Sequence, residues 1–379
     1  MKKIVHIQLL PILSGAQRVS LDELQRLPND KFDKYLICCG IGPLTIEAEK
    51  LGIKCIIIDS LTREISPIKD FKALINLIKI LKEYRFDIVH THSSKTGVIG
   101  RLAGFISKTP LIIHTVHGYS FPAAKNNTQR IIYYFMERVG SICGNKLICL
   151  HEIDKNIAIQ KLKVKPDDIY IIPNGVDVQK YTLPSVEIKQ LYRQSLNLSM
   201  DDIVIGMTGR LWLQKNPIFL LENMLPLFME NKNIKVLFIG DGELKNELES
   251  IINTHNLVNQ VYLLGWRNDI EHILQAIDIF TLPSKWEGMP LAILEAQSSG
   301  LPCVVSNIPG NNNLVSNNID GFIFNLESDG EDFRDKIKQL IYSNELRIKL
   351  GTKSREKVMR HYSIEQRIRQ IEIIYDKLI

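Results

Sequence analysis

Short apolar runs alternate with longer segments of mixed polarity along this chain of 379 residues. The runs are rich in Ile, Val and Leu, which is typical of strands buried on both faces of a sheet. In the first half they read KIVHIQLL, KYLICCG, KCIIIDS, FDIVHTH, PLIIHTVHG, NKLICL and DIYIIPNG. From residue 202 onward a second series reads DIVIGMTGR, KVLFIGDG, VYLLGW, IFTLPS, PCVVS and DGFIFN.

Segments of helical periodicity separate many of these runs. The clearest is 69–85, where apolar side chains at 71, 74, 75, 78 and 81 predict one buried stripe. Because strands alternate with helices, the pattern predicts an α/β fold with parallel sheets covered by helices on both faces. Further helices are predicted at 98–107, 129–140, 217–231, 243–256, 269–277, 290–299 and 331–343.

The strand–helix rhythm is interrupted at about 178–200 by Pro184 and a polar stretch. We therefore predict one α/β domain over residues 1–180 and a second over 190–360. The last segment is amphipathic and could pack on either domain, with Ile364, Ile368, Ile371, Ile374 and Tyr375 on one side. In sheets of this kind ligands bind beyond the carboxyl ends of the strands, so residues that directly follow strands are the candidates for function.

The composition is that of an ordinary globular protein, with 45% hydrophobic and 23% charged residues. The amino-terminal apolar run contains His6 and Gln8 and lacks a small-residue cleavage site, so a buried strand explains it better than a signal peptide. No window offers the roughly 18 apolar residues of a membrane span. We expect a soluble, cytoplasmic protein. The six cysteines form no CxxC pair and are expected to be reduced core residues.

The net charge of +5 is unevenly distributed. Residues 1–180 carry 26 Lys and Arg against 17 Asp and Glu, whereas the remainder carries 21 against 25. A basic amino-terminal half suggests an anionic partner, such as a phospholipid surface, a lipid diphosphate acceptor or nucleic acid. Solvated lysines without a partner are the alternative.

The sharpest candidate site is WEGMPLAILEA at 286–296, which follows a predicted strand. Pro290 suits the first turn of a helix, and the start of that helix offers N–H groups to a diphosphate. Glu295 lies within this otherwise apolar helix and needs hydrogen-bond donors, a role that sugar hydroxyls can fill. Glu287 stands beside Gly288, whose missing side chain lets a ligand approach the backbone. The alternative is two carboxylates that cap or salt-bridge a structural helix.

A second candidate is TGRLWLQKN at 208–216. Arg210 and Lys215 lie five residues apart on a loop that follows a strand. Two cations there suit a pyrophosphate and would stabilise the charge that develops on a departing diphosphate. Exposed loops often carry such residues without any ligand, so this motif is weak by itself.

Histidines end two predicted strands. His117 precedes Gly118 and is expected to point into a cleft, where it could hydrogen-bond to a sugar; a satisfied buried histidine is the alternative. His114, His90 and His92 lie nearby, but no adjacent carboxylate completes a metal-binding set, so a metal is disfavoured.

The first strand is followed by LSGAQ at 13–17, where Gly15 permits a close approach of the backbone to a ligand. This turn is not a GxGxxG sequence, and the chain carries no nicotinamide fingerprint. A lone glycine turn is weak evidence for a binding site.

Seven short motifs occur in an order that resembles the large retaining glycosyltransferase family four: SGA, HTVHG, PNGVD, GRLxxxKN, GDG, DIFTLPS and EGMPLAILE. The resemblance covers essentially the whole chain. It implies the GT-B fold, in which two Rossmann-like domains carry parallel sheets that face a central cleft. The acceptor domain would be 1–180, the nucleotide-sugar-binding domain 190–360, and a helix at 361–379 would cross back to the first domain. Ser14 stands where family members usually have a first glycine, and Gln17 where an acidic residue is common.

The resemblance also implies roles for individual residues. Arg210 and Lys215 would hold the diphosphate, and Glu295 would bind the ribose hydroxyls. No metal or other cofactor is expected, and the nucleotide-sugar is a substrate. The implied catalytic set is Glu287, His117, Arg210 and Lys215, and the implied donor-binding set is Gly15, Arg210, Lys215, Trp266, Arg267, Glu287, Gly288, Met289, Pro290, Leu291 and Glu295.

We therefore expect a retaining glycosyltransferase that moves a sugar from a nucleotide diphosphate donor, a UDP-sugar by family frequency, to a lipid-linked or saccharide acceptor. Bacterial surface polysaccharide, either O-antigen of lipopolysaccharide or capsule, is the expected product. The basic first half and the Lys-rich helix at 69–85 favour peripheral association with the inner membrane, and no nucleic-acid partner is expected. The alternatives are a sugar-nucleotide epimerase on the same fold and a non-catalytic nucleotide-sugar-binding protein.

Overall fold

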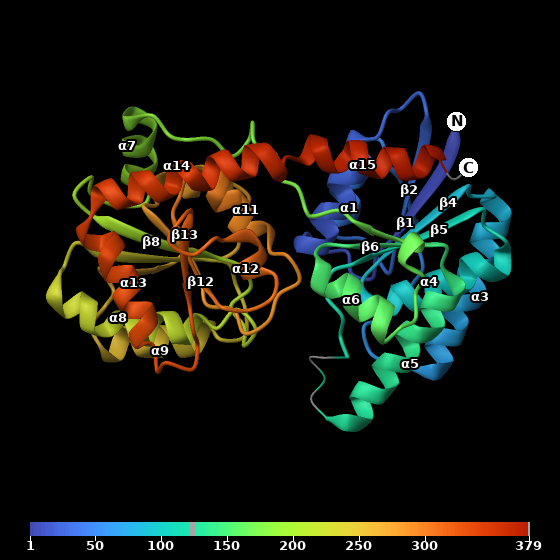
Figure 1. Cartoon of the computed structure of the whole chain (residues 1–379), viewed down its shortest axis with the longest axis horizontal. Coiled ribbons are helices and arrows are strands. Elements are labelled where there is room, and N and C mark those ends of the chain that lie inside the picture. Colours follow the sequence, from blue (N-terminus) through green and yellow to red (C-terminus); the bar gives the residue numbers. More distant parts are fainter. Residues whose placement is uncertain (122–123, 125, 378–379) are drawn as a thin grey trace. The chain divides into compact units, whose positions relative to one another are not determined.

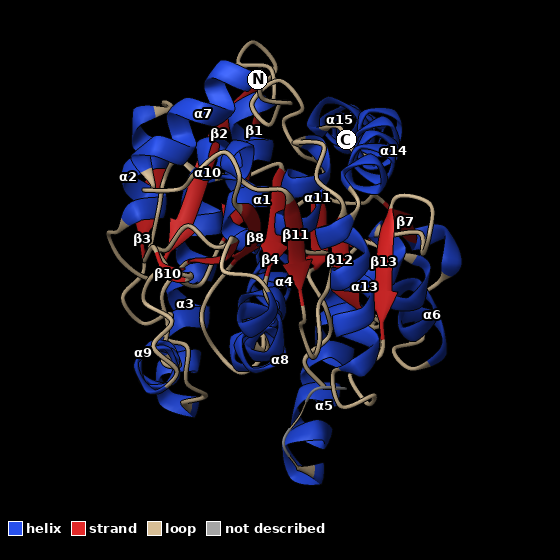
Figure 2. Ribbon diagram, turned by 90° about the vertical axis from the view of Figure 1, so that its left-hand side faces the viewer, coloured by secondary structure: helices blue, strands red, loops and turns tan. Residues whose placement is uncertain are grey.

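The computed structural model describes residues 1–121, 124 and 126–377. The chain divides into two compact units (Figure 1). Unit 1 consists of Met1–Asn174 together with Glu365–Ile379, and unit 2 is the continuous segment Gly175–Ile364. Each unit contains one parallel sheet flanked by helices (Figure 2), which confirms the predicted α/β class.

The sheet of unit 1 has seven strands in the order β3-β2-β1-β4-β5-β6-β7. Its first six positions follow the order of the classical dinucleotide-binding sheet, in which the chain reverses direction across the sheet between β1 and β4. Every predicted run of the first half became a strand: β1 Lys2–Ile7, β2 Phe32–Cys38, β3 Lys54–Ile57, β4 Ile88–His92, β5 Leu111–Val116, β6 Lys146–Cys149 and β7 Ile169–Ile171.

Successive side chains of β1 enter two different cores, because strand residues alternate between the faces of a sheet. Ile4 packs with Leu24 and Ile371 on one face, and Val5 packs with Leu77 and Ala103 on the other. The helices of this unit are α1 Gly15–Arg26, α2 Pro43–Lys50, α3 Pro67–Tyr84, α4 Ser94–Ser107, α5 Asn127–Cys143, α6 Glu152–Gln160 and α15 Ile364–Lys377.

The buried face of α3 differs from the predicted stripe. Ala73, Leu77 and Leu81 are buried, whereas Phe71 is 66% exposed and Ile75 is 37% exposed. The sheet and α4 fully cover only one row at i, i+4 spacing, so Phe71 and Ile75 face outward, while Leu74 and Ile78 pack partly against the same core. The helix itself was predicted correctly, but the assignment of its inner face was wrong for Phe71 and Ile75.

The sheet of unit 2 has six strands in the order β10-β9-β8-β11-β12-β13. They are β8 Ile203–Thr208, β9 Ile234–Ile239, β10 Val261–Leu263, β11 Ile279–Leu282, β12 Cys303–Ser306 and β13 Gly321–Phe324. The helices are α7 Val186–Ser195, α8 Pro217–Glu230, α9 Lys245–Thr254, α10 Ile270–Ala276, α11 Leu291–Ser298, α12 Asn311–Leu314, α13 Glu331–Tyr342 and α14 Asn344–His361.

Helix α7 lies within residues 178–200, where the sequence predicts a break between the two domains. Its cap is Ser185, whose Oγ accepts from the N–H of Ile188. Arg193 anchors the helix, because its buried guanidinium donates to three backbone carbonyls near residue 200 and to Asp278. Apolar residues of the helix such as Leu191 are exposed. Residues 186–195 of the stretch are therefore helical, and hydrophobic periodicity did not predict this helix because a polar side chain holds it in place.

The last helix belongs to unit 1. Ile371, Ile374 and Tyr375 of α15 are buried in its core. Arg367 forms an ion pair of 2.6 Å with Glu23 of α1, and both side chains are almost completely buried. Among the described residues, no helix combines the length and the apolar character needed to cross a membrane.

Candidate active site

The loops after β8 and β9 in unit 2 touch through glycine backbones. Gly209 follows β8 with φ +143°, and Gly240 follows β9 with φ +147°. A Cβ atom on Gly240 would overlap the carbonyl oxygen of Gly209. Glycine is therefore required there, and the tight contact sets the path of the loop that carries Arg210 and Lys215.

Lys215 and Glu287 are brought together by two loops. The ammonium of Lys215 lies 2.6 Å from Glu287 Oε1, and both side chains are largely buried. Ser284 donates to the same carboxylate oxygen over 2.7 Å. Gln214 donates to the carbonyl of Trp286 over 2.8 Å, so backbone and side chain hold the two loops in register.

These loops follow β8 and β11, the two neighbouring strands at which the chain reverses direction across the sheet. Open α/β sheets bind ligands at this position. The sequence placed Lys215 and Glu287 in separate motifs, and their partnership was not predicted. Ser284 and Gln214 lie inside quoted motifs, yet neither was recognised as a residue that holds the carboxylate.

Arg210 takes a different position from Lys215. Its side chain is exposed, and its guanidinium lies 4.6 Å from the centre of the Trp212 ring. Stacking of this kind leaves the planar edge of the guanidinium for hydrogen bonding. The two cations of the loop therefore differ: Lys215 is paired, and Arg210 is stacked at the surface.

Glu295 is a half-buried residue of α11 and accepts a hydrogen bond of 3.0 Å from the hydroxyl of Tyr181. Tyr181 is itself buried and was not recognised from the sequence. Its carbonyl accepts from Ser298 over 2.7 Å, so α11 holds the tyrosine that contacts the carboxylate. Pro290 is the cap residue of α11, and Leu291 is the first helical residue.

The remaining predicted residues of unit 2 lie on neighbouring loops. Gly288 packs against Gly310, where a Cβ atom on Gly310 would overlap the carbonyl oxygen of Gly288. Met289 is buried. Trp266 follows β10 and is 57% exposed, so its ring can stack on a ligand. Arg267 forms a two-pronged ion pair with Asp269, which raises the pKa of the arginine.

Gly15 is the first residue of α1 in unit 1. A Cβ atom there would meet no atom within 4 Å, so packing within the protein does not require glycine at this position. Ser14 is the cap residue, and its hydroxyl donates to Gln17. The two residues that depart from the family pattern therefore contact each other.

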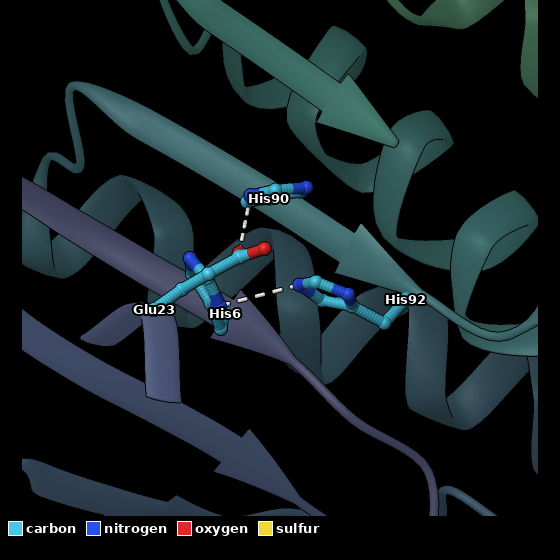
Figure 3. Close-up of side chains that lie close together, drawn as sticks. All are labelled: His6, Glu23, His90 and His92. Atoms are coloured by element: carbon cyan, nitrogen blue, oxygen red, sulfur yellow. Dashed lines mark hydrogen bonds and ion pairs between the residues drawn. The ribbon is translucent and has the colours of Figure 1, made fainter. Parts of the chain in front are cut away.

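His117 follows β5 and is half-buried. Its Nε2 lies 3.1 Å from Nδ1 of His92, which ends β4. His92 in turn contacts His6, and Figure 3 shows His6, His90 and His92 gathered around Glu23. The histidines of neighbouring strands therefore form one cluster in the core of unit 1.

The position of Glu23 contradicts the expectation that no carboxylate lies near the histidines. The metal was disfavoured because no carboxylate stood near the histidines, yet Glu23 Oε2 lies 3.8 Å from Nδ1 of His90. The carboxylate comes from α1, far from the strand-end motifs in sequence. One ligand atom each from His6, Glu23, His90 and His92 lies within 4.8 Å of the others, so the residue types of a metal site are present.

Burial keeps these histidines neutral. Desolvation lowers the pKa of His6 and of His117 to about 3. It lowers the pKa values of His90 and His92 well below their ordinary range as well. Neutral imidazoles can donate from one nitrogen and accept at the other, so the cluster is suited to hydrogen bonding.

Comparison with known proteins identifies the family. The model of the family described as Glycosyltransferase Family 4 matches residues 13–180, and the model described as Glycosyl transferases group 1 matches residues 188–357. The UDP-Gal:alpha-D-GlcNAc-diphosphoundecaprenol alpha-1,3-galactosyltransferase of Escherichia coli is 45% identical over 100% of this chain and 97% of its own length. The chain belongs to this glycosyltransferase family.

More distant relatives agree with this assignment. The N,N'-diacetylbacillosaminyl-diphospho-undecaprenol alpha-1,3-N-acetylgalactosaminyltransferase of Campylobacter jejuni is 26% identical over 92% of this chain and 93% of its own length. The crystal structure of Anabaena HepE with UDP and glucose has a TM-score of 0.86 at 19% identity, with full coverage of both chains. This likeness confirms the GT-B fold of the glycosyltransferase.

The neutral histidines predict a loss of stability in acid. The unfolded chain protonates its histidines below about pH 6.5, whereas the folded chain holds His6 neutral down to about pH 3. The free energy of unfolding should therefore fall as the pH drops from about 6.5 towards 4. Each such histidine contributes a slope of about 1.4 kcal/mol per pH unit.

The variant His6→Gln should reduce this slope by about one proton, or about 1.4 kcal/mol per pH unit. His255→Gln, at an exposed position of unit 2, serves as the matched control and should leave the slope unchanged. Urea unfolding curves between pH 4 and pH 7 give the slopes. Burial raises the pKa of Glu23, so its protonation increases the free energy of unfolding as the pH falls, in opposition to the histidines. Both variants retain Glu23, so this contribution cancels in their comparison. Equal slopes for the two variants would show that His6 is protonated in the folded chain.

Proposed function

We propose that this glycosyltransferase moves a hexose, with galactose as the first candidate, from a UDP-sugar to a hydroxyl of a lipid-diphosphate-linked sugar, with retention of configuration. The product would be a bacterial surface polysaccharide. The observation that carries the proposal is the convergence of Lys215, Glu287 and the start of α11 at the edge of the unit 2 sheet. The full-length relative that acts on UDP-Gal and a diphosphoundecaprenol-linked sugar supports the choice of substrates.

In this proposal the cations of the loop after β8 bind the diphosphate. Lys215 supplies a point charge and Arg210 a planar fork, while the first N–H groups of α11 face the phosphates. Glu295 binds the ribose hydroxyls, and the tyrosine hydroxyl on its Oε1 orients the carboxylate. Trp266 and Arg267 lie near the base.

Glu287 and the backbone of Gly288, Met289 and Pro290 bind hydroxyls of the donor sugar, with Leu291 beside them. Glu287 also holds the ammonium of Lys215 in place before the substrate arrives, so the ammonium is pre-organised for the leaving group. His117 of unit 1 hydrogen-bonds to the transferred sugar, and the backbone at Gly15 approaches a substrate.

The transfer breaks the bond between the anomeric carbon and the diphosphate oxygen. The acceptor oxygen bonds to the same face of that carbon, and its proton passes to the departing phosphate. Lys215 and Arg210 stabilise the negative charge that accumulates on the diphosphate. Because side chains supply this charge, the proposed reaction needs no metal ion. Glu287 and Glu295 do not act as a glycosidase pair, since one of them binds ribose.

In this proposal the reaction takes place at the inner face of the cytoplasmic membrane, because the acceptor is a membrane lipid, and α5 offers a surface that could contact this membrane. Its side chains Ile131, Phe135, Val139 and Ile142 form an exposed stripe at helical spacing. Phe135 is 61% exposed. Apolar helix faces of this kind insert at the boundary between headgroups and acyl chains.

Basic residues accompany this apolar stripe. The hydroxyl of Tyr134 in α5 donates to the carbonyl of Lys161 over 3.1 Å, so the segment after α6 lies beside α5. Lys161, Lys163 and Lys165 of that segment are exposed. Lysines near an anionic leaflet contribute about 1 kcal/mol each to binding, so the apolar stripe and these lysines together fit a peripheral membrane enzyme.

The substrate assignment is tested with purified enzyme and a panel of nucleotide sugars. We expect slow release of UDP from UDP-galactose without acceptor, and faster release when a short-chain lipid-diphosphate-linked N-acetylhexosamine is added. Nuclear magnetic resonance of the product should show an α linkage. Isomerised UDP-sugar without acceptor would identify an epimerase, and binding without turnover would identify a non-catalytic protein.

Loss of either cation should slow the chemical step. We expect Lys215→Ala and Arg210→Ala each to lower kcat at least about a hundredfold, because transition-state charge loses a fixed partner. Lys285→Ala is the matched control, since Lys285 is exposed on the neighbouring loop. Initial rates at saturating donor measure the effect. Wild-type turnover in both variants would exclude the proposed diphosphate site.

The membrane surface is tested with vesicles that contain phosphatidylglycerol. Phe135→Asp should lower the vesicle partition coefficient about tenfold or more, because burial of a phenyl ring contributes about 1.5–3 kcal/mol. Ile348→Asp, at a residue of α14 in unit 2 that is 61% exposed, is the control. Binding of the wild type should weaken with added salt. Equal binding by both variants would remove α5 from the interface.

A further inference from the structure

A chain of hydrogen bonds leads from His117 into the core of unit 1. Nε2 of His117 lies 3.1 Å from Nδ1 of His92. Nε2 of His92 lies 3.2 Å from Nδ1 of His6, and His6 Nδ1 also lies 2.9 Å from the hydroxyl of Ser20. His92 and His6 therefore each use both ring nitrogens, one toward each neighbour in the series of hydrogen bonds.

The series of hydrogen bonds continues through Tyr375 of α15. Nε2 of His6 lies 3.2 Å from the hydroxyl of Tyr375, which lies 2.6 Å from Nδ1 of His90. Nε2 of His90 lies 2.8 Å from the hydroxyl of Thr115 on β5. A half-buried histidine at the end of one strand is thus connected with a tyrosine of the last helix.

Neutral imidazoles make this chain directional. A neutral ring carries one N–H donor and one acceptor nitrogen, so its two hydrogen bonds must run in the same sense. Burial keeps His6, His90 and His92 neutral, and it raises the pKa of Tyr375 so that its hydroxyl keeps the proton. If every ring bonds to both of its neighbours and Tyr375 donates to one of the two histidines, the tautomers have two arrangements along this series of hydrogen bonds, and these are opposite in every ring.

The distances at Tyr375 select one arrangement. The hydroxyl has a single proton for two histidine neighbours, at 2.6 Å and 3.2 Å. Hydroxyl donors form shorter hydrogen bonds than N–H donors. Tyr375 therefore donates to Nδ1 of His90 and accepts from Nε2–H of His6.

We infer that this relay fixes the tautomer of His117, so that its Nε2 carries the proton and its Nδ1 presents an acceptor to the substrate. His6 accepts at Nδ1, which lies 2.9 Å from the hydroxyl of Ser20 and 3.2 Å from Nε2 of His92. An unprotonated Nε2 on His92 would face this nitrogen lone pair to lone pair, so Nε2 of His92 carries the proton, and Nδ1 of His92 then accepts from His117. The relay rests on the proposed function in one respect: the group that donates to His117 Nδ1 is a hydroxyl of the transferred sugar. Tyr375, His6 and His92 are positioning residues for that contact.

A metal ion at the same residues is the competing explanation. The Oε2 atom of Glu23 is buried and has no hydrogen-bond partner among the described residues, as a ligand atom would. The ring nitrogens, however, already bond to one another, to Ser20 and to Tyr375. An ion would have to displace these bonds, so the observations favour the relay.

The tautomer of His117 can be measured without any substrate. In enzyme labelled with nitrogen-15 histidine, two-bond correlation spectra at pH 7.5 distinguish protonated from unprotonated ring nitrogens. The His117 signals are assigned by their loss in His117→Gln. We expect protonated Nε2 and unprotonated Nδ1 in the wild type.

Removal of one hydroxyl should disturb the distant ring. In Tyr375→Phe the rings of His6 and His90 lose the group between them, and we expect signal from the Nδ1–H tautomer of His117 to appear. Tyr84→Phe, a half-buried tyrosine stacked on Phe86 in the same unit, is the matched control and should leave the spectrum unchanged. Thr115→Val removes the acceptor for Nε2–H of His90 and should likewise increase the signal from the Nδ1–H tautomer of His117. This variant replaces Tyr375→Phe in the experiment if Tyr375→Phe does not fold.

Activity gives a second measurement. Loss of one oriented hydrogen bond should lower kcat/KM about two- to tenfold, whereas affinity for UDP should stay unchanged because its proposed contacts lie in unit 2. The relay would be overturned if the tautomer of His117 stayed the same in both variants. It would also be overturned if the purified wild type contained one equivalent of zinc and the His90→Phe variant contained none. If the wild type transfers no sugar, the proposed function fails, but the spectra still decide the relay.

Discussion

The ion pair between Lys215 and Glu287 is the contact on which the unit 2 site depends. It joins two loops that leave the sheet where the strand order changes direction, and both side chains are largely removed from water. A buried cation is stable only beside a counter-charge, so the carboxylate is what allows a lysine to stay at this sheet edge. The helix start at Leu291, which faces the same edge, adds a positive end of its own dipole.

The strands could be predicted because parallel strands are covered on both sides and therefore appear as uninterrupted apolar runs. Several helices were not predicted by the same reasoning, and α7 and α14 show why. Helix α7 is anchored by the buried guanidinium of Arg193, and α14 buries little more than Leu350, Gly351, Ser354 and Val358 along 18 residues. Where polar groups or small residues make the packing contacts, hydrophobic periodicity has no signal.

The site shows a similar division. Short motifs after strands predicted Arg210, Lys215, Glu287 and Glu295 as candidates, because the strand pattern fixes which residues lie at the edge of a sheet. Partners could not be identified, since they depend on which loops are neighbours in space: Glu295 meets a tyrosine 114 positions earlier in the chain. Glu23 was not predicted for the same reason. Because it lies among the histidines, the lack of a carboxylate can no longer be used as an argument against a metal ion.

The path of the chain makes unit 2 an insertion within unit 1. Its first and last residues are neighbours, because the N–H of Val176 donates to the carbonyl of Tyr362 over 2.9 Å and the N–H of Ile364 donates back to Val176 over 2.9 Å. A continuous segment with adjacent ends can be excised and produced alone, as an independently folding module for crystallography with nucleotides. Unit 1 cannot be obtained by truncation after Asn174, since its core would lose α15. It would need a short artificial linker from Asn174 to Glu365.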